Sequence, residues 1–144
     1  MAAAALALAG CATGAPAADD GRIQVVAVTD VYGDMAGIIG GDLVDVDSLI
    51  SGSAQDPHSF EASAQDRLAI EDADVVIVNG GGYDDFMTTL LDASAGGQTV
   101  VDAVEVSGLP GAGEEGFNEH VWYDFGAIQA VAASIADAYT TARP

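Results

Sequence analysis

Basic side chains are scarce in this sequence. It contains no lysine, and Arg22, Arg67 and Arg143 are its only arginines, whereas Asp and Glu together number 23 and give a formal net charge of -20 at pH 7. Proteins that bind nucleic acid neutralise phosphate groups with clustered Lys and Arg. The composition therefore excludes nucleic acid as a partner. An acidic surface of this kind keeps a folded protein soluble.

Cysteines and long apolar runs are also lacking. Cys11 is the only cysteine, which excludes an internal disulfide, and no segment approaches the roughly 18 apolar residues of a membrane-spanning helix. Leu8-Ala9-Gly10-Cys11 resembles the lipobox of bacterial lipoproteins, in which the cysteine is lipidated. The resemblance implies that residues 1–20 are a lipoprotein-type signal and a disordered linker, with Cys11 as the lipidation site. It also implies an extracytoplasmic protein, anchored by lipid to the outer face of the cytoplasmic membrane or lying in the periplasm.

The composition as a whole is that of a folded domain. Hydrophobic residues make up 50% of the 144 residues, which is too apolar for a disordered acidic chain and suits a single core. Unbroken apolar runs predict buried strands at Ile23–Val28 and Val75–Val78. Leu43–Ile50 partly alternates, which is typical of a strand nearer a sheet edge, and Thr99–Val104 is the fourth predicted strand.

Helical periodicity separates these strands. Apolar side chains recur at three- and four-residue spacings in three segments, and Ser63 and Asp124 are good N-caps for helices that follow them. The apolar positions are Val31, Met35, Ile38 and Ile39, then Tyr83, Phe86, Met87, Leu90 and Leu91, then Ile128, Val131, Ala132, Ile135 and Tyr139. This alternation predicts an α/β domain with a four-stranded, mainly parallel sheet flanked by helices.

Both histidines of the sequence fall in loops that follow predicted strands. His58 comes after the second strand and His120 after the fourth. Because the carboxyl ends of parallel strands meet at one rim of a sheet, we expect the two imidazoles to lie together. Pro57 restricts the backbone before His58 and forces Asp56 into an extended conformation, so that this histidine would be held on a stiff segment.

Two segments carry a family resemblance. The run from Asp56 to Asp66 (DPHSFEASAQD), followed by Ala73 to Gly80 (ADVVIVNG), resembles the solute-binding proteins of zinc and manganese ABC transporters, the cluster A-I family also called TroA-like or ZnuA-like. The stretch from Asn118 to Asp124 (NEHVWYD) is similar to the segment that contains the second histidine ligand of this family. A proline common in the family before this histidine is replaced by Glu119, and another, after the following Asp, by Phe125.

The resemblance implies a function and a domain organisation. It implies metal ligation by His58 and His120, with zinc favoured and manganese possible as the transported ion, and an ABC transporter membrane permease as the partner. The sequence itself offers no clear catalytic apparatus, because it has no Gly-x-Ser-x-Gly motif and Cys11 is its only thiol, so we expect no enzymatic activity. Residues 21–144 would be the N-terminal, metal-binding lobe of a two-lobed protein, with the C-terminal lobe absent from this chain. Metal uptake should weaken on acidification, because only neutral imidazole coordinates.

Two other functions remain open at this point. A zinc-dependent hydrolase would hold zinc with His58 and His120 and use a nearby acid such as Glu119 to activate water. A nucleotide-binding module would use Gly80, Gly81 and Gly82, which follow a strand, but Asp85 stands where a phosphate loop needs its third spaced glycine. We interpret the three glycines as a sharp turn, with Tyr83 beginning the apolar stripe of the next helix.

Overall fold

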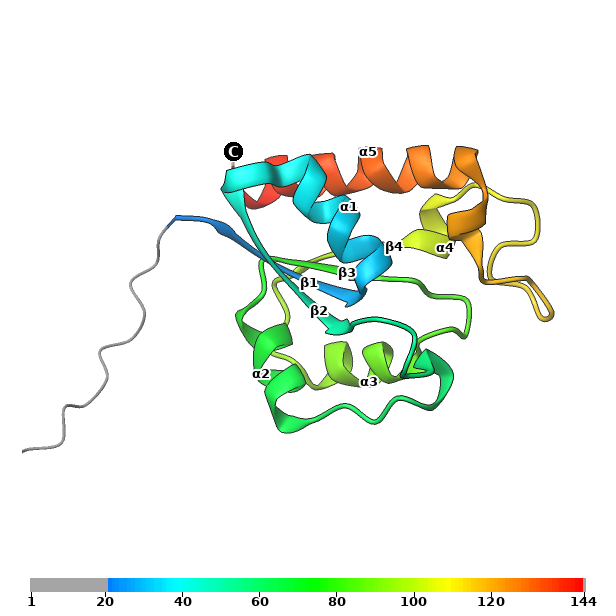
Figure 1. The fold of residues 1–144 in the computed structure, drawn as a ribbon, viewed down its shortest axis with the longest axis horizontal. Helices are drawn as coiled ribbons and strands as arrows, with labels where there is room; N and C mark the ends of the chain where they lie inside the picture. Colours follow the sequence, from blue (N-terminus) through cyan, green and yellow to red (C-terminus); the bar gives the residue numbers. More distant parts are fainter. Residues whose placement is uncertain (1–20, 144) are drawn as a thin grey trace, which may run out of the picture.

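Four parallel strands form the central sheet of the computed structural model, which describes residues 21–143. They are β1 (Ile23–Thr29), β2 (Val44–Ile50), β3 (Val75–Val78) and β4 (Thr99–Asp102), and they lie in the order β2-β1-β3-β4 (Figure 1). β1 therefore pairs with β2 on one side and β3 on the other. The predicted α/β fold with a parallel four-stranded sheet is confirmed, as is the edge position of the second strand.

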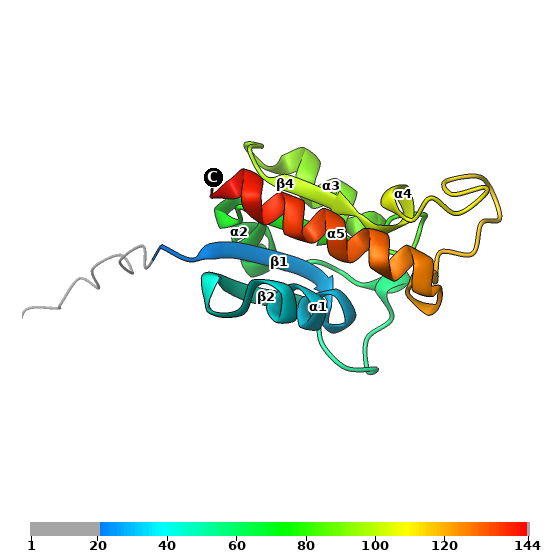
Figure 2. The same ribbon diagram turned by 90° about the horizontal axis from the view of Figure 1, so that it is seen from above.

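Helices cover both faces of this sheet. α1 (Asp30–Gly40) and α5 (Phe125–Ala142) pack together on one face, whereas α2 (Ala64–Asp72) and α3 (Asp85–Ala93) lie on the other (Figures 1 and 2). Figure 2 shows α5 running the length of the sheet beside α1. The short helix α4 (Ala103–Val106) follows β4, and single 3-10 turns occur at Gly41–Leu43, Pro57–Ser59 and Val121–Tyr123. Among residues 21–143, no helix is both long and apolar enough to span a membrane.

The burial of the strands follows from their places in the sheet. Val75, Val76 and Ile77 of β3 are fully buried because helices cover both faces of this inner strand. On the edge strand β2, Asp45 and Asp47 are exposed while Val44 and Ile50 are buried. The unbroken apolar run and the partial alternation in the sequence thus correspond to an inner and an outer strand.

Three details differ from the sequence-based predictions. The fourth strand ends at Asp102 rather than Val104, because the Asp102 carboxylate accepts a 3.0 Å hydrogen bond from the backbone N–H of Glu105 and caps α4. Ile38 is 84% exposed and does not belong to the core side of α1, which buries Tyr32 and Ala36 instead. Tyr83 precedes α3 and is not part of its apolar stripe.

The carboxyl ends of the strands converge on one rim, on the right in Figure 1. There lie the loop between β2 and α2 (residues 51–63), the turn between β3 and α3 (residues 79–84), and the long loop between α4 and α5 (residues 107–124). The first and third of these segments contain the two histidines. Arg143 lies at the opposite end of the sheet, where its guanidinium is 3.4 Å from the carbonyl of Arg22, so the rim is far from these two cations.

Candidate metal centre

His58 lies on a short, capped segment of the β2–α2 loop. Pro57 begins the 3-10 turn, Asp56 is extended with φ -92° and ψ 117°, and its carboxylate accepts a 3.1 Å hydrogen bond from the backbone N–H of His58. The loop then ends in a capping box, in which Ser63 and Asp66 accept hydrogen bonds from each other's backbone N–H groups. The predicted extended Asp56 and the Ser63 cap are both confirmed, and they limit the motion of the histidine backbone.

His120 is held by its neighbours in the loop before α5. The side-chain oxygen of Asn118 accepts a 3.1 Å hydrogen bond from the backbone N–H of His120 and lies 2.8 Å from its ring Nδ1. Four residues later, the Asp124 carboxylate caps α5 by accepting from the N–H of Ala127 at 2.9 Å, as predicted. The histidine is therefore placed just ahead of the longest helix in the described part of the chain.

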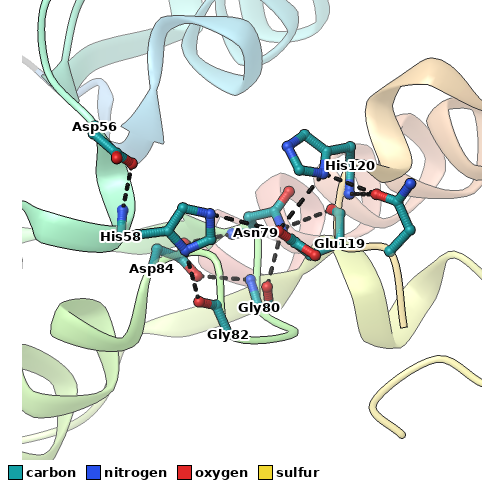
Figure 3. Close-up of polar contacts among 9 residues, drawn as sticks. Asp56, His58, Asn79, Gly80, Gly82, Asp84, Glu119 and His120 are labelled. Carbon is teal, nitrogen blue, oxygen red and sulfur yellow. Dashed lines mark hydrogen bonds and ion pairs between the residues drawn. The ribbon is translucent and has the colours of Figure 1, made fainter. Parts of the chain in front are cut away.

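The structure brings the two imidazoles to the same place on the rim (Figure 3). Both face the carboxylate of Glu119: its Oε1 lies 3.5 Å from Nε2 of His58 and 3.6 Å from Nδ1 of His120. The Tyr83 ring lies against both, with its centroid 5.2 Å from that of His58 and 5.8 Å from that of His120. Trp122 packs edgewise on Tyr83, with the two ring centroids 5.1 Å apart.

The hydrogen bonds decide which ring nitrogen of each histidine is free. Nδ1 of His58 lies 3.2 Å from the carbonyl oxygen of Gly82, which only accepts, so this nitrogen carries the hydrogen. The Asn118 oxygen already accepts from a backbone N–H, and Nδ1 of His120 therefore also donates to it. In the neutral form of each ring, Nε2 is therefore the nitrogen with the lone pair, and this is the form in which histidine binds a transition metal.

A buried polar network holds the two loops together beneath the imidazoles. Asn79, fully buried at the end of β3, donates through its side-chain amide to the carbonyls of Gly80 and Glu119, each at 3.0 Å. Its side-chain oxygen accepts from the hydroxyl of Tyr32 on α1. One buried amide thus links β3, α1 and the loop of His120, and buried networks of this kind are stabilising only when every member is paired.

Asp84 shapes the turn between β3 and α3. Its two carboxylate oxygens accept from the backbone N–H groups of Asn79, at 2.7 Å, and Gly80, at 2.8 Å. Gly80 has φ +75°, and a Cβ there would lie 2.3 Å from the Asp102 carboxylate, so only glycine fits. Because Asp84 occupies the N–H of Gly80, this amide is not available to a phosphate. The interpretation of the glycines as a turn is confirmed.

The electrostatic environment of the rim is negative. Burial, followed by the charges of Asp84, Asp56, Glu119 and Asp30, raises the pKa of Tyr83, which stays a neutral phenol. Burial is also the main cause that raises the pKa of Asp84 to about 6. Carboxylates that converge on a site without a neighbouring Arg or Lys favour the binding of a cation.

The two imidazoles are too few to complete the coordination sphere of a metal ion. Within residues 21–143, no three His, Cys, Asp or Glu side chains are arranged to hold a metal ion as they stand. Two imidazoles supply two of the four donors of a tetrahedral zinc ion. The geometry therefore suits a metal ion that gains further ligands from elsewhere.

Comparison with known proteins agrees with this geometry. The sequence model of the family described as "ZnuA: Zinc-uptake complex component A periplasmic" matches residues 25–144. The chain belongs to this family. The family is described by its part in a zinc-uptake complex, and the matched relatives are named as metal-binding or substrate-binding lipoproteins and not as hydrolases.

The relatives of the ZnuA family that match the chain differ in the metal that they are named for. The manganese-binding lipoprotein MntA of Bacillus subtilis is 36% identical over 123 residues, which are 81% of this chain and 40% of MntA. The iron ABC transporter substrate-binding lipoprotein MtsA of Streptococcus pyogenes serotype M1 is 31% identical over 120 residues, covering 76% of this chain and 38% of MtsA. The chain thus spans about 40% of the length of the curated relatives that it matches.

Solved structures show the same fold. The metal-dependent lipoprotein YcdH of Bacillus subtilis superposes with a TM-score of 0.73 at 24% identity, and the match covers 85% of this chain and 46% of YcdH. The likeness confirms the ZnuA-type α/β arrangement and extends over slightly less than half of the longer protein.

Sequence reasoning named the two histidines but missed several residues around them. The sequence predicts no role for Asn79 and places Tyr83 in a helix stripe, although these residues support and flank the imidazoles. The asparagine that directly follows the apolar strand was the sequence signal that pointed to Asn79. Cys11 lies outside the described residues.

Proposed function

We propose that this chain binds a divalent transition-metal ion through Nε2 of His58 and Nε2 of His120 and delivers it to the membrane permease of an ABC transporter. The observation that carries the proposal is the convergence of the two rings on Glu119, each with Nδ1 hydrogen-bonded to an oxygen, so that Nε2 is the lone-pair nitrogen of the neutral ring. The His58 ring, held through Nδ1 by the Gly82 carbonyl, needs little further ordering to bind a metal ion. The permease partner and the transport role rest on the family and on the names of the relatives.

The proposal extends to domain organisation and location. We propose that residues 21–144 form the N-terminal lobe of a two-lobed binding protein, whose other lobe supplies the remaining ligands. The matches to about 40% of MntA and 46% of YcdH support this division. Lipidation at Cys11 and an extracytoplasmic location are supported by the lipobox-like sequence and by the names of MntA and YcdH, both of which are called lipoproteins.

Zinc is the ion that we propose binds most tightly to the two imidazoles. Nitrogen-donor sites follow the Irving–Williams order, in which zinc ranks above iron and manganese in the divalent state. The family description names zinc, whereas MntA is named for manganese and MtsA for iron. The intrinsic preference of two histidines can differ from the cargo, because the donors of a second lobe and the metals available in the cell also decide which ion is carried.

Equilibrium dialysis of the metal-free chain tests the proposal. The chain is dialysed against Zn²⁺, Mn²⁺ and Fe²⁺, separately and in competition, and the bound metal is measured by mass spectrometry. We expect one ion per chain, with Zn²⁺ displacing Mn²⁺, and affinity that falls as the pH is lowered because protons compete for the imidazoles. No saturable uptake of any of the three ions would contradict the function. Preferential uptake of Mn²⁺ would contradict the choice of zinc.

A further inference from the structure

Glu119 occupies an unusual position between the two imidazoles. One carboxylate oxygen, Oε1, is within 3.6 Å of ring nitrogens of both histidines, and the side chain is only 19% exposed. Its backbone carbonyl is bonded to Asn79, and its Cβ lies against the glycine turn, 3.3 Å from where a Cβ on Gly81 would be. The backbone and Cβ of Glu119 are therefore held in place, which limits where its carboxylate can lie.

When His58 is neutral, its contact with Glu119 joins two hydrogen-bond acceptors. Because Nδ1 of His58 donates to the Gly82 carbonyl, Nε2 presents a lone pair toward the negatively charged oxygen. Their separation of 3.5 Å also exceeds the range of about 2.7–3.2 Å for an N–H···O hydrogen bond. A lone pair and a carboxylate repel each other unless a positive charge lies between them.

The separation of these two atoms matches that of two ligands on one metal ion. Zinc binds imidazole nitrogen and carboxylate oxygen at about 2.0–2.2 Å, so at the tetrahedral angle the two donor atoms are about 3.3–3.5 Å apart. The measured distance from Nε2 of His58 to Oε1 of Glu119 is 3.5 Å. The pair is thus already spaced to share an ion.

We propose that Glu119 is a third metal ligand supplied by this chain, a role that rests on the proposed function of the two histidines. The ion binds to Nε2 of His58 and Oε1 of Glu119, and His120 joins through Nε2 after its ring turns. At present His120 directs Nδ1 toward the carboxylate and toward Asn118, so turning the ring gives up the Asn118 hydrogen bond. The His120 side chain is 41% exposed, and rotation about χ2 itself has a low cost. The chain then provides two nitrogen donors and one oxygen donor.

An oxygen donor changes the predicted selectivity of the site. Carboxylate suits harder ions such as Mn²⁺ better than imidazole does, so Glu119 should narrow the preference for zinc over manganese. It also lets the chain bind a metal ion more tightly than two imidazoles would. These two properties separate a ligand from a residue that only positions the histidines.

Titration calorimetry and Co²⁺ spectroscopy test this role on the full chain. Glu119→Gln is compared with the native chain and with Glu115→Gln, which makes the same charge change at an exposed site in the same loop. We expect Glu119→Gln to weaken Mn²⁺ and Zn²⁺ binding by about tenfold or more, with the larger loss for Mn²⁺. It should also shift the visible absorption bands of bound Co²⁺, whereas Glu115→Gln should behave as native. Circular dichroism and a melting curve confirm that each variant is folded.

The outcomes distinguish this inference from the proposed function. If His58→Ala/His120→Ala abolishes binding but Glu119→Gln keeps the native affinities and Co²⁺ bands, Glu119 is not a ligand although the histidines are. Weaker binding with unchanged Co²⁺ bands also overturns the inference, because the donor set is then unaltered. If the native chain takes up none of Zn²⁺, Mn²⁺ and Fe²⁺, both proposals fail.

Discussion

The side-chain amide of Asn79 donates a 3.0 Å hydrogen bond to the backbone carbonyl of Glu119, 40 residues away in the sequence. This bond ties the end of the inner strand β3 to the loop that contains His120. In the turn after β3, the Gly82 carbonyl accepts a hydrogen bond from the ring of His58. One short segment therefore positions both imidazoles. The separation of the histidines therefore depends on the β3–α3 turn.

Asn79→Ala should lower both stability and metal affinity. It leaves the buried hydroxyl of Tyr32 without its partner, which costs about 1–3 kcal/mol in the free energy of unfolding. It also releases the loop of His120, and we expect metal binding to weaken by about tenfold. Urea denaturation and calorimetry measure the two effects.

Tyr32→Phe is the matched control for Asn79→Ala. It removes the hydroxyl from the same network but keeps the bond between Asn79 and Glu119, so it should reduce stability with little change in metal affinity. Equal losses of affinity in both variants would show that the Asn79–Glu119 bond does not position the site.

Asp84 should make stability fall as the pH rises between about 4 and 6. Its pKa is raised from 3.8 to about 6 in the folded protein, chiefly by burial, so in this window the folded chain keeps a proton that the unfolded chain has lost. The group's contribution, on the order of 3 kcal/mol, is present below pH 4 and is lost as the pH passes through about 6.

Asp84→Asn tests this linkage, because asparagine does not titrate. Across the same pH window, the free energy of unfolding of the native chain should decline relative to that of the variant. Asp85→Asn, an exposed change one residue later, should instead follow the native profile. Parallel profiles for the native chain and Asp84→Asn would contradict the assignment.

Ser63→Ala should destabilise the chain without affecting the metal site. The serine oxygen accepts from the N–H groups of Gln65 and Asp66, both at 3.2 Å, and losing such a cap costs about 1 kcal/mol, or roughly 4 °C in Tm. Ser53→Ala, in an exposed part of the same loop, is the control and should melt as the native chain does. A Tm unchanged by Ser63→Ala would mean that the capping box does not stabilise α2.

Local sequence signals were sufficient to predict the parallel sheet and the rim on which the two histidines lie. The apolar run of β3 and the alternation of β2 reflect burial on two faces and on one, and parallel topology then brings His58 and His120 to the same rim. The caps at Ser63 and Asp124 were predictable because capping depends on residues close in sequence.

The interior of the site could not be predicted because it depends on contacts between distant segments. The pairing of Asn79 with Tyr32 and Glu119 joins residues 47 and 40 positions apart. Tyr83 matched the helical period of Phe86 and Leu90, but the turn held by Asp84 places it outside the helix and beside the imidazoles. The exposure of Ile38 is set by how α1 lies on the sheet and not by its sequence spacing.

The most direct test of the account is titration calorimetry of Zn²⁺ into the metal-free native chain and into His58→Ala/His120→Ala. Both side chains are more than 40% exposed, at 46% and 41%, so the double variant should fold normally, as circular dichroism can verify. We predict one saturable Zn²⁺ site in the native chain and no measurable binding in the double variant. Equal Zn²⁺ affinity in the two proteins would contradict the claim that these imidazoles form the metal site.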